Sequence, residues 1–322
     1  MRIGFIGLGT MGASMAHNLL QAGLPVSVHD VRPEAAAPHL AAGATWADSP
    51  AAMAAACDAV FTCLPNLDAI EAVALGPDGL ITAARPGFAF FEMSTNSPEM
   101  VRRLHAAFDA KGATMLDAPI SGGKIGAATR RLAIWVGGDR ASFDRFRPAL
   151  DAMADRVTHI GASGAGLVTK IVHNCASQLF YPALAEVFAM GVKAGADPVS
   201  LWEAIRQGSI GRRRTFDGMI DEFLPGTYDS PSAALRIVYK DMMVATELAR
   251  DLGVPLRYAN LALADVQEAM LRGWSERDSR CVMLLPQERI GVHIEEDPAR
   301  IQAVLDRDPP APTDTRRGKP AS

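Results

Sequence analysis

Short apolar runs alternate with amphipathic stretches along the first half of the chain. Seven of these runs are predicted as strands, at residues 2–7, 26–30, 59–65, 88–94, 114–120, 132–138 and 156–161. Most are almost continuously apolar, which is typical of strands covered on both faces. Alanine-rich stretches with helical periodicity separate the earlier runs. This alternation predicts an α/β fold with a doubly wound parallel sheet and crossover helices.

The pattern changes after Gly161, and no strand-like run recurs beyond it. Residues 166–194 are predicted to form one long helix. Pro182 lies inside this stretch, where it removes a backbone hydrogen bond and favours a bend. The second half of the chain is therefore expected to be all-α.

A further helix is expected to start with Asp197 as N-cap and Pro198 at the first helical position, and to end before Gly208. Two more helices are predicted near residues 231–252 and 255–272. We find no internal repeat.

Composition narrows the classes of protein. A chain of 322 residues, 49% of them apolar, favours two domains with a large core. The formal net charge of −4 provides no basic field for nucleic acid or an anionic membrane. The four cysteines show no metal or redox spacing, and neither a signal peptide nor a membrane span is recognisable. We therefore expect a cytoplasmic protein with no bound metal and no nucleic-acid or membrane partner.

A glycine-rich stretch, GFIGLGTMG, follows the first predicted strand and opens a predicted helix. Gly7, Gly9 and Gly12 have the G-x-G-x-x-G spacing, which in this context predicts a dinucleotide-binding loop. The first glycine permits a tight turn, the second lets a pyrophosphate approach, and the third lets the helix pack on the strand. The N-terminus of the helix also attracts phosphates. The loop predicted to contact the cofactor consists of Gly7, Leu8, Gly9, Thr10, Met11 and Gly12.

Asp30 ends the second predicted strand. An acid at this place suits the ribose hydroxyls of NAD and repels the additional phosphate of NADP. Arg32 lies two residues further on and could instead accept that phosphate. The sequence thus favours NAD and leaves NADP open. An ordinary glycine turn with a surface acid is the plain alternative, which the strand, the spacing and the acid together argue against.

Two later stretches carry candidate chemistry. Ser121, Gly122 and Gly123 follow a strand and can present a hydroxyl and consecutive N–H groups to a carboxylate, although a plain glycine turn is equally compatible. Lys170 and Asn174 are four residues apart and share one helix face. A lysine among apolar neighbours either extends to water or is desolvated and able to exchange a proton with a substrate.

Neighbouring residues offer rival interpretations. His173 could act as an acid or base but is expected to be a packed imidazole, and Cys175 is expected to be a buried structural thiol. Lys240 and Asp241 form a charged pair that by itself suggests an exposed helix face.

In this order, GFIGLGTMGASMAHNL, DAPISGG, GAGLVTKIVHN and YKD resemble the β-hydroxyacid dehydrogenases, a family that includes 3-hydroxyisobutyrate dehydrogenase and tartronate semialdehyde reductase. The resemblance covers about residues 1–292. It implies a Rossmann domain, a long linking helix and a helical domain that forms homodimers or homotetramers. It also implies hydride transfer between NAD(P) and a β-hydroxy acid or its semialdehyde.

The resemblance implies roles for particular residues. Lys170 matches the catalytic lysine and Asn174 its supporting substrate contact, while Ser121, Gly122 and Gly123 match the loop that binds the substrate carboxylate. The matching cofactor contacts are Leu64, Pro65, Thr95 near the nicotinamide, and Lys240 with its companion Asp241.

Three parts of the chain are thereby predicted: a dinucleotide-binding domain at residues 1–163, a helical substrate and oligomerisation domain at 164–293, and a tail at 294–322. The end of the tail is rich in proline and charge and is expected to be disordered.

The chain also departs from the family pattern. Arg130 and Arg131 replace small residues, and Arg212, Arg213 and Arg214 form an unfamiliar run. One of these arginines is a candidate for a second anionic group of the substrate, with solvated surface as the plain alternative. The alternatives for function are an imine reductase of similar fold and a non-catalytic dinucleotide-binding sensor. The decarboxylating 6-phosphogluconate dehydrogenase would need a larger helical domain.

Overall fold

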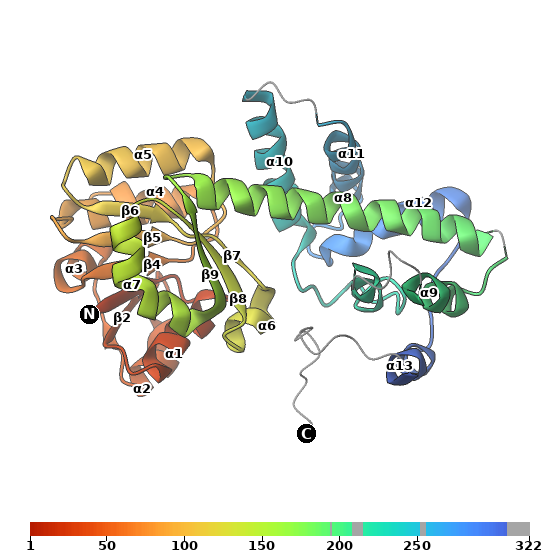
Figure 1. Cartoon of the computed structure of the whole chain (residues 1–322), viewed down its shortest axis with the longest axis horizontal. Coiled ribbons are helices and arrows are strands. Elements are labelled where there is room, and N and C mark those ends of the chain that lie inside the picture. Colours follow the sequence, from red (N-terminus) through yellow and green to blue (C-terminus); the bar gives the residue numbers. More distant parts are fainter. Residues whose placement is uncertain (194, 208–214, 252–255, 308–322) are drawn as a thin grey trace. The chain divides into compact units, whose positions relative to one another are not determined.

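The structure, a computed structural model, describes residues 1–193, 195–207, 215–251 and 256–307 (Figure 1). The chain forms two compact units, of which the first ends at Val172 and the second begins at His173. This division falls inside the long helix α8 (Ala165–Lys193), whereas the sequence analysis placed the domain boundary just before that helix.

The first unit is built on a nine-stranded sheet. Its strands are β1 (Ile3–Ile6), β2 (Val26–His29), β3 (Thr45–Trp46), β4 (Ala59–Thr62), β5 (Ala89–Glu92), β6 (Thr114–Asp117), β7 (Ile120–Ser121), β8 (Leu132–Gly137) and β9 (Ala154–Gly161). The strand order is β3-β2-β1-β4-β5-β6-β8-β7, and β9 pairs with β8. The first six strands are parallel, in the doubly wound order that the sequence predicted. β8 is antiparallel to β6 and β7, so the sheet also has an antiparallel part.

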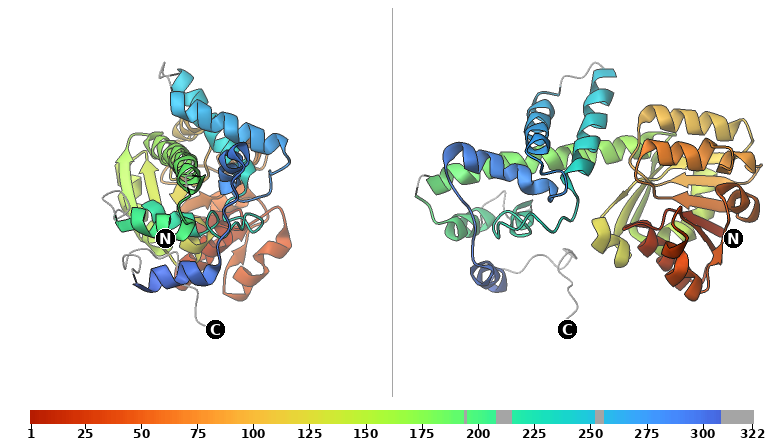
Figure 2. Two further views of the ribbon diagram at one scale, coloured as in Figure 1. Left: turned by 90° about the vertical axis from the view of Figure 1, so that its right-hand side faces the viewer. Right: turned by 180° about the vertical axis from the view of Figure 1, so that it is seen from behind.

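Helices cover both faces of this sheet (Figures 1 and 2). One face carries the helices α1 (Gly12–Gln21), α2 (Ala37–Ala41), α6 (Gly123–Ala128) and α7 (Arg140–Met153), with the 3₁₀ helix η1 (Pro33–Ala36). The other carries α3 (Pro50–Ala56), α4 (Leu67–Leu75), α5 (Pro98–Asp109) and the 3₁₀ helix η2 (Leu80–Thr82). Phe61 and Phe91 stack on the first face with ring centroids 4.6 Å apart, while Val60 and Phe90 pack on the second. This alternation explains why the strands are apolar throughout.

In the described part of the second unit the regular elements are helices, apart from an isolated bridge between Ala234 and Asp278. Its helices are α9 (Pro198–Gln207), η4 (Thr215–Ile220), α10 (Leu235–Asp251), α11 (Arg257–Leu271), η5 (Ser279–Met283), α12 (Leu284–Ile290) and α13 (Pro298–Arg307). Helix α8 continues through Pro182 as one element. Asp197 caps α9 by accepting the Ser200 N–H at 2.9 Å, as the sequence predicted. Gly208 and the arginine run at 212–214 lie outside the described residues.

Part of the stretch that the sequence analysis assigned to a tail is ordered and packed. Ile294, together with Ile301 and Leu305 of α13, is buried in the same cluster as Trp202 and Phe223. The remainder, residues 308–322, lies outside the described residues.

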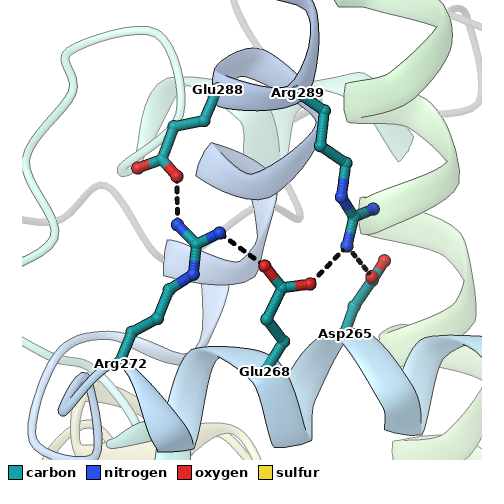
Figure 3. Close-up of polar contacts among 5 residues, drawn as sticks. All are labelled: Asp265, Glu268, Arg272, Glu288 and Arg289. Atoms are coloured by element: carbon teal, nitrogen blue, oxygen red, sulfur yellow. Dashed lines mark hydrogen bonds and ion pairs between the residues drawn. The ribbon is translucent and has the colours of Figure 1, made fainter.

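Two arginines and three acidic residues form a network of ion pairs. The network links α11, and the residue that follows it, to α12 (Figure 3). Arg289 bonds to Asp265 at 2.5 Å and to Glu268 at 2.7 Å, and Arg272 bonds to Glu268 at 2.5 Å and to Glu288. We call these five residues the α11–α12 network. Most of their side chains are more than one third exposed, so the network lies at the surface.

Candidate active site

The carboxyl ends of neighbouring parallel strands carry most of the predicted site residues. Gly7, Asp30, Leu64 and Thr95 follow β1, β2, β4 and β5, respectively, and Ser121 is the last residue of β7. Doubly wound sheets bind their ligands outside the carboxyl ends of the strands, where the strand order reverses. In this sheet the reversal lies at β1, between β2 and β4. The topology therefore brings these residues to one edge of the first unit.

The glycine loop has the shape that a dinucleotide requires. Gly7 has a φ of +94°, and a Cβ there would collide with the Cys63 carbonyl oxygen. A Cβ on Gly12 would collide with the carbonyl oxygen of Gly7. A Cβ on Gly9, by contrast, would meet no atom within 4 Å. The loop thus packs tightly on its inner side and leaves room over Gly9, where a pyrophosphate fits.

The start of α1 also fits a phosphate. Helices α3, α4, α5 and α7 begin with a side-chain cap, from Ser49, Asn66, Ser97 and Asp139. The cap position of α1 holds Met11, which makes no side-chain hydrogen bond to the helix within the described structure. No side chain of the described residues therefore occupies the place of an anion at this first turn, although the Ala13 N–H already donates to the Gly9 carbonyl at 3.0 Å.

Asp30 makes structural contacts that the sequence analysis did not predict. Its side chain is only 7% exposed, and its carboxylate accepts the N–H of Leu8 at 2.7 Å and that of Arg32 at 2.9 Å. The Arg32 guanidinium lies 3.5 Å from the same carboxylate. Asp30 therefore holds the glycine loop in place and partly neutralises Arg32.

The segments after β4 and β5 are linked by hydrogen bonds. Ser94 Oγ accepts the Leu64 N–H at 2.8 Å, and the Ser94 N–H donates to Glu92 at 2.9 Å. Burial raises the pKa of Glu92 to about 7, against the opposing effect of hydrogen bonds from Ser94 and Asn96. Leu64 and Thr95 are half-buried and Pro65 is exposed. Sequence reasoning missed Glu92 and Ser94, although an acid that ends an apolar strand is a recognisable signal.

Lys170 lies in the first unit, on a helix whose start is fixed by the sheet. Asp117, at the end of β6, accepts the N–H of Gly164 and that of Leu167, each at 2.7 Å. Burial raises the pKa of Asp117, and these N–H groups oppose the increase. Lys170 is half-buried one turn further along α8. Asp117 was also missed, although it ends an apolar run.

Lys170 acts electrostatically on Cys63, which precedes the segment that the family resemblance predicts to line the cofactor. Burial raises the pKa of the Cys63 thiol to about 12, Glu92 raises it further, and Lys170 opposes them. Cys63 directly precedes Leu64, so the lysine and this segment belong to one neighbourhood. A thiol with such a raised pKa is unreactive.

The Ser121 loop follows the short strand β7. Ser121 is half-buried, while Gly122 and Gly123 are exposed, with φ of +135° and +61°. Arg130 also has a positive φ, of +59°, and donates to Gln21 on α1 at 2.7 Å. This bond gives Arg130 a partner within the protein, whereas Arg131 is exposed.

In the second unit, Asp241 connects two predicted site residues. Its carboxylate accepts the Asn174 side-chain N–H at 2.6 Å and lies 3.0 Å from the Lys240 ammonium. Asp241 is only 9% exposed, which differs from the exposed face that the sequence suggested for this pair. His173 lies beside Asn174, with its Nδ1 3.1 Å from the amide oxygen. Asn174 is one turn after Lys170 on α8.

The fold and the glycine loop define a nicotinamide-dinucleotide-binding oxidoreductase with a helical second domain. Residues 2–161 match the family model of the NAD-binding domain of 6-phosphogluconate dehydrogenase. Residues 164–285 match the model described as the NAD-binding domain of NADP-dependent 3-hydroxyisobutyrate dehydrogenase. The chain belongs to the β-hydroxyacid dehydrogenase family, as the motifs predicted.

Similarity to relatives of known activity covers nearly the whole chain. The 2-(hydroxymethyl)glutarate dehydrogenase of Eubacterium barkeri is 33% identical over 91% of this chain and 97% of that protein. The NAD-dependent L-serine dehydrogenase of Pseudomonas aeruginosa is 35% identical over 88% and 97%. The structure of Mycobacterium tuberculosis 3-hydroxyisobutyrate dehydrogenase with L-serine has a TM-score of 0.77 and 31% identity, covering 88% and 98%.

The imine reductase alternative is only distantly supported. An imine reductase from a Pseudomonas species has a TM-score of 0.54 at 20% identity, which shows a shared fold alone. In the part of the chain that the structure describes, no helix combines the length and apolar character needed to cross a bilayer.

Proposed function

We propose that this chain oxidises a β-hydroxy acid, or reduces the matching semialdehyde, with Lys170 as the general acid and base. The bound nicotinamide supplies the hydride acceptor or donor. Lys170 takes the proton of the substrate hydroxyl, or returns it in the reverse direction. The observation that carries this assignment is the anchoring of α8 by Asp117, which sets Lys170 in the neighbourhood of the Leu64 segment.

The names of the relatives indicate a shared substrate core. 2-(Hydroxymethyl)glutarate, L-serine and 3-hydroxyisobutyrate all contain a CH₂OH group on the carbon next to a carboxylate. We propose that this chain acts on the same core. Ser121, Gly122 and Gly123 would bind the carboxylate, and Asn174, oriented by Asp241, would contact the reacting oxygen.

The test replaces Lys170 by Ala and compares both proteins on a panel of hydroxy acids that share this core. General acid–base assistance is worth roughly 10²–10⁴-fold, so kcat should fall by that factor while NADH binding is retained. Absorbance at the NADH band reports turnover, and fluorescence titration reports binding. Near-normal turnover of the variant would reject Lys170. Dinucleotide binding without turnover of any substrate by the wild type would favour the sensor alternative.

For the cofactor we propose NAD over NADP, because the buried Asp30 carboxylate would repel a 2′-phosphate and its pairing occupies Arg32. Asp30→Ala removes this charge and also the acceptor of the Leu8 N–H. We expect kcat/KM with NAD to fall by about tenfold, with a smaller change for NADP because the repulsion is lost as well. Arg32→Ala, the control, should keep the preference for NAD. A wild type that prefers NADP would show that Arg32 governs the pocket.

We also propose a homodimer or homotetramer, which the family resemblance implies, and a place in the cytoplasm, where scattered thiols stay reduced. Light scattering after size-exclusion chromatography measures the assembly directly, and a monomer at micromolar concentration would contradict this part of the proposal.

A further inference from the structure

One buried hydroxyl joins the two segments that we propose to line the nicotinamide, Leu64–Pro65 and Thr95. The Leu64 N–H donates to Ser94 Oγ at 2.8 Å. The Ser94 hydroxyl in turn donates to the Glu92 carboxylate. Ser94 directly precedes Thr95, so the backbone at both segments is tied to one side chain.

These hydrogen bonds lead to the carboxylate of Glu92. It is fully buried, and its carboxylate accepts the Ser94 N–H at 2.9 Å and the side-chain N–H of Asn96. Donors from both sides of Thr95 therefore converge on one carboxylate. In the sheet register Glu92 lies opposite Thr62, the last residue of the strand that leads to Leu64.

The setting of Glu92 is costly for the fold. The preceding positions on this strand, Phe90 and Phe91, are buried and apolar. A carboxylate in such a place is tolerated because donors surround it, and an apolar side chain would serve stability equally well or better. What an apolar side chain cannot do is orient the N–H and hydroxyl groups of the loop. This difference favours a role in placing the loop.

We propose that Glu92 is a positioning residue of the cofactor site: through Ser94 and Asn96 it fixes the backbone of Leu64–Pro65 and Thr95 against the nicotinamide. The proposal rests on the proposed function, because it requires these segments to contact the bound dinucleotide. Glu92 itself touches neither cofactor nor substrate in this scheme.

The test compares two serines of the same loop. Ser94→Ala removes the acceptor of the Leu64 N–H, and Ser97→Ala removes the acceptor of the Met100 N–H, which Ser97 Oγ receives at 3.1 Å. Ser94→Ala also removes the hydroxyl donor to Glu92, so its Tm should fall at least as far as that of Ser97→Ala, which loses one hydrogen bond. Only Ser94→Ala should weaken NADH binding, by about threefold or more, and lower kcat/KM by roughly 10- to 100-fold through misplaced cofactor.

A second pair of variants tests the polarity of the bonds to Glu92. At pH 8, Asn96→Asp places a new carboxylate against that of Glu92. Their repulsion should weaken NADH binding. Adding Glu92→Gln supplies an amide donor to the new carboxylate, so the double variant should recover at least about threefold of the lost affinity. A role in packing alone predicts no such recovery.

The outcomes separate this proposal from the proposed function. If the wild type binds NADH and turns over a hydroxy acid but Ser94→Ala and Ser97→Ala behave alike, the positioning role is wrong and the enzyme assignment stands. If Asn96→Asp folds and Glu92→Gln does not restore binding, the role of Glu92 is wrong as well. If Asn96→Asp does not fold, the two serine variants decide alone. A wild type that binds neither NADH nor NADPH would overturn both proposals.

Discussion

Two groups of acidic side chains differ in their surroundings. One group lies buried at the carboxyl ends of the sheet strands, and the other lies at the surface in the α11–α12 network. Asp30, Glu92 and Asp117 are each less than 10% exposed and accept backbone N–H groups from a loop or helix beside them. The acids of the network instead bond to long arginine side chains on the surface of the second unit (Figure 3).

This difference determines what each carboxylate can hold. A backbone N–H has little freedom, so a buried acceptor fixes the chain itself, and losing that acceptor leaves a buried donor unpaired. An exposed ion pair between flexible side chains contributes little to stability. Asp241 is intermediate, because it is buried yet holds two side chains, those of Asn174 and Lys240.

The largest loss of stability from a single substitution should come at the anchor of α8. Asp117→Asn leaves one of the N–H groups of Gly164 and Leu167 without an acceptor in a buried place. We expect a loss of about 2–3 kcal/mol in the free energy of unfolding of the first unit. Asp139→Asn is the matched control: Asp139 caps α7 at an exposed site, and Asn is an equally good cap. Urea denaturation measures both, and equal losses would contradict the contrast between buried and exposed acceptors.

Glu92 should make stability depend on pH. In the unfolded chain its pKa is near the ordinary 4.5, and in the folded chain it is about 7. Between these values the folded protein binds the additional proton, so stability falls as pH rises from about 4.5 to 7, by up to about 3 kcal/mol in total. Glu92→Gln should lack this contribution. Denaturant midpoints are measured at pH 5 and pH 7.5 for the wild type and for Glu92→Gln. The same pH dependence in both proteins would contradict the contribution of Glu92.

The smallest effect should come from the α11–α12 network. Arg289→Ala removes bonds to Asp265 and Glu268 that lie at the surface. We expect Tm to fall by no more than about 3 °C, and by less in high salt, which screens exposed pairs. Differential scanning calorimetry at low and high salt tests this. A loss as large as that of Asp117→Asn would erase the contrast between the two settings.

Most of the sheet could be predicted, because its strands are apolar throughout and alternate with helical stretches. The strands Thr45–Trp46 and Ile120–Ser121 are each only two residues long and leave no periodic pattern. The antiparallel direction of β8 depends on the chain path, which hydrophobicity does not encode. Helix α13 did leave a signal, since Asp297 and Pro298 repeat the start that identified α9.

Residues of the candidate site could be predicted where a motif carries the chemistry. Gly7 and Asp30 have a diagnostic spacing, and Lys170 was predicted from its helix face and the family resemblance. Glu92 and Asp117 were not found, because what they do depends on which N–H groups the fold brings to them. An acid that ends an apolar strand marks such a residue, but its partners are up to 50 positions away in the sequence.

The three glycines of the loop differ in what a single added methyl group would cost. At Gly7 and Gly12 that methyl would strike the backbone, so a cell carrying the change would have less folded protein, whatever substrate it grows on. At Gly9 the methyl has free space, so the protein would accumulate normally, and under the proposed function the cost would fall on cofactor binding. If the proposed function holds, selection would remove changes at Gly7 and Gly12 through protein abundance, and changes at Gly9 through metabolism.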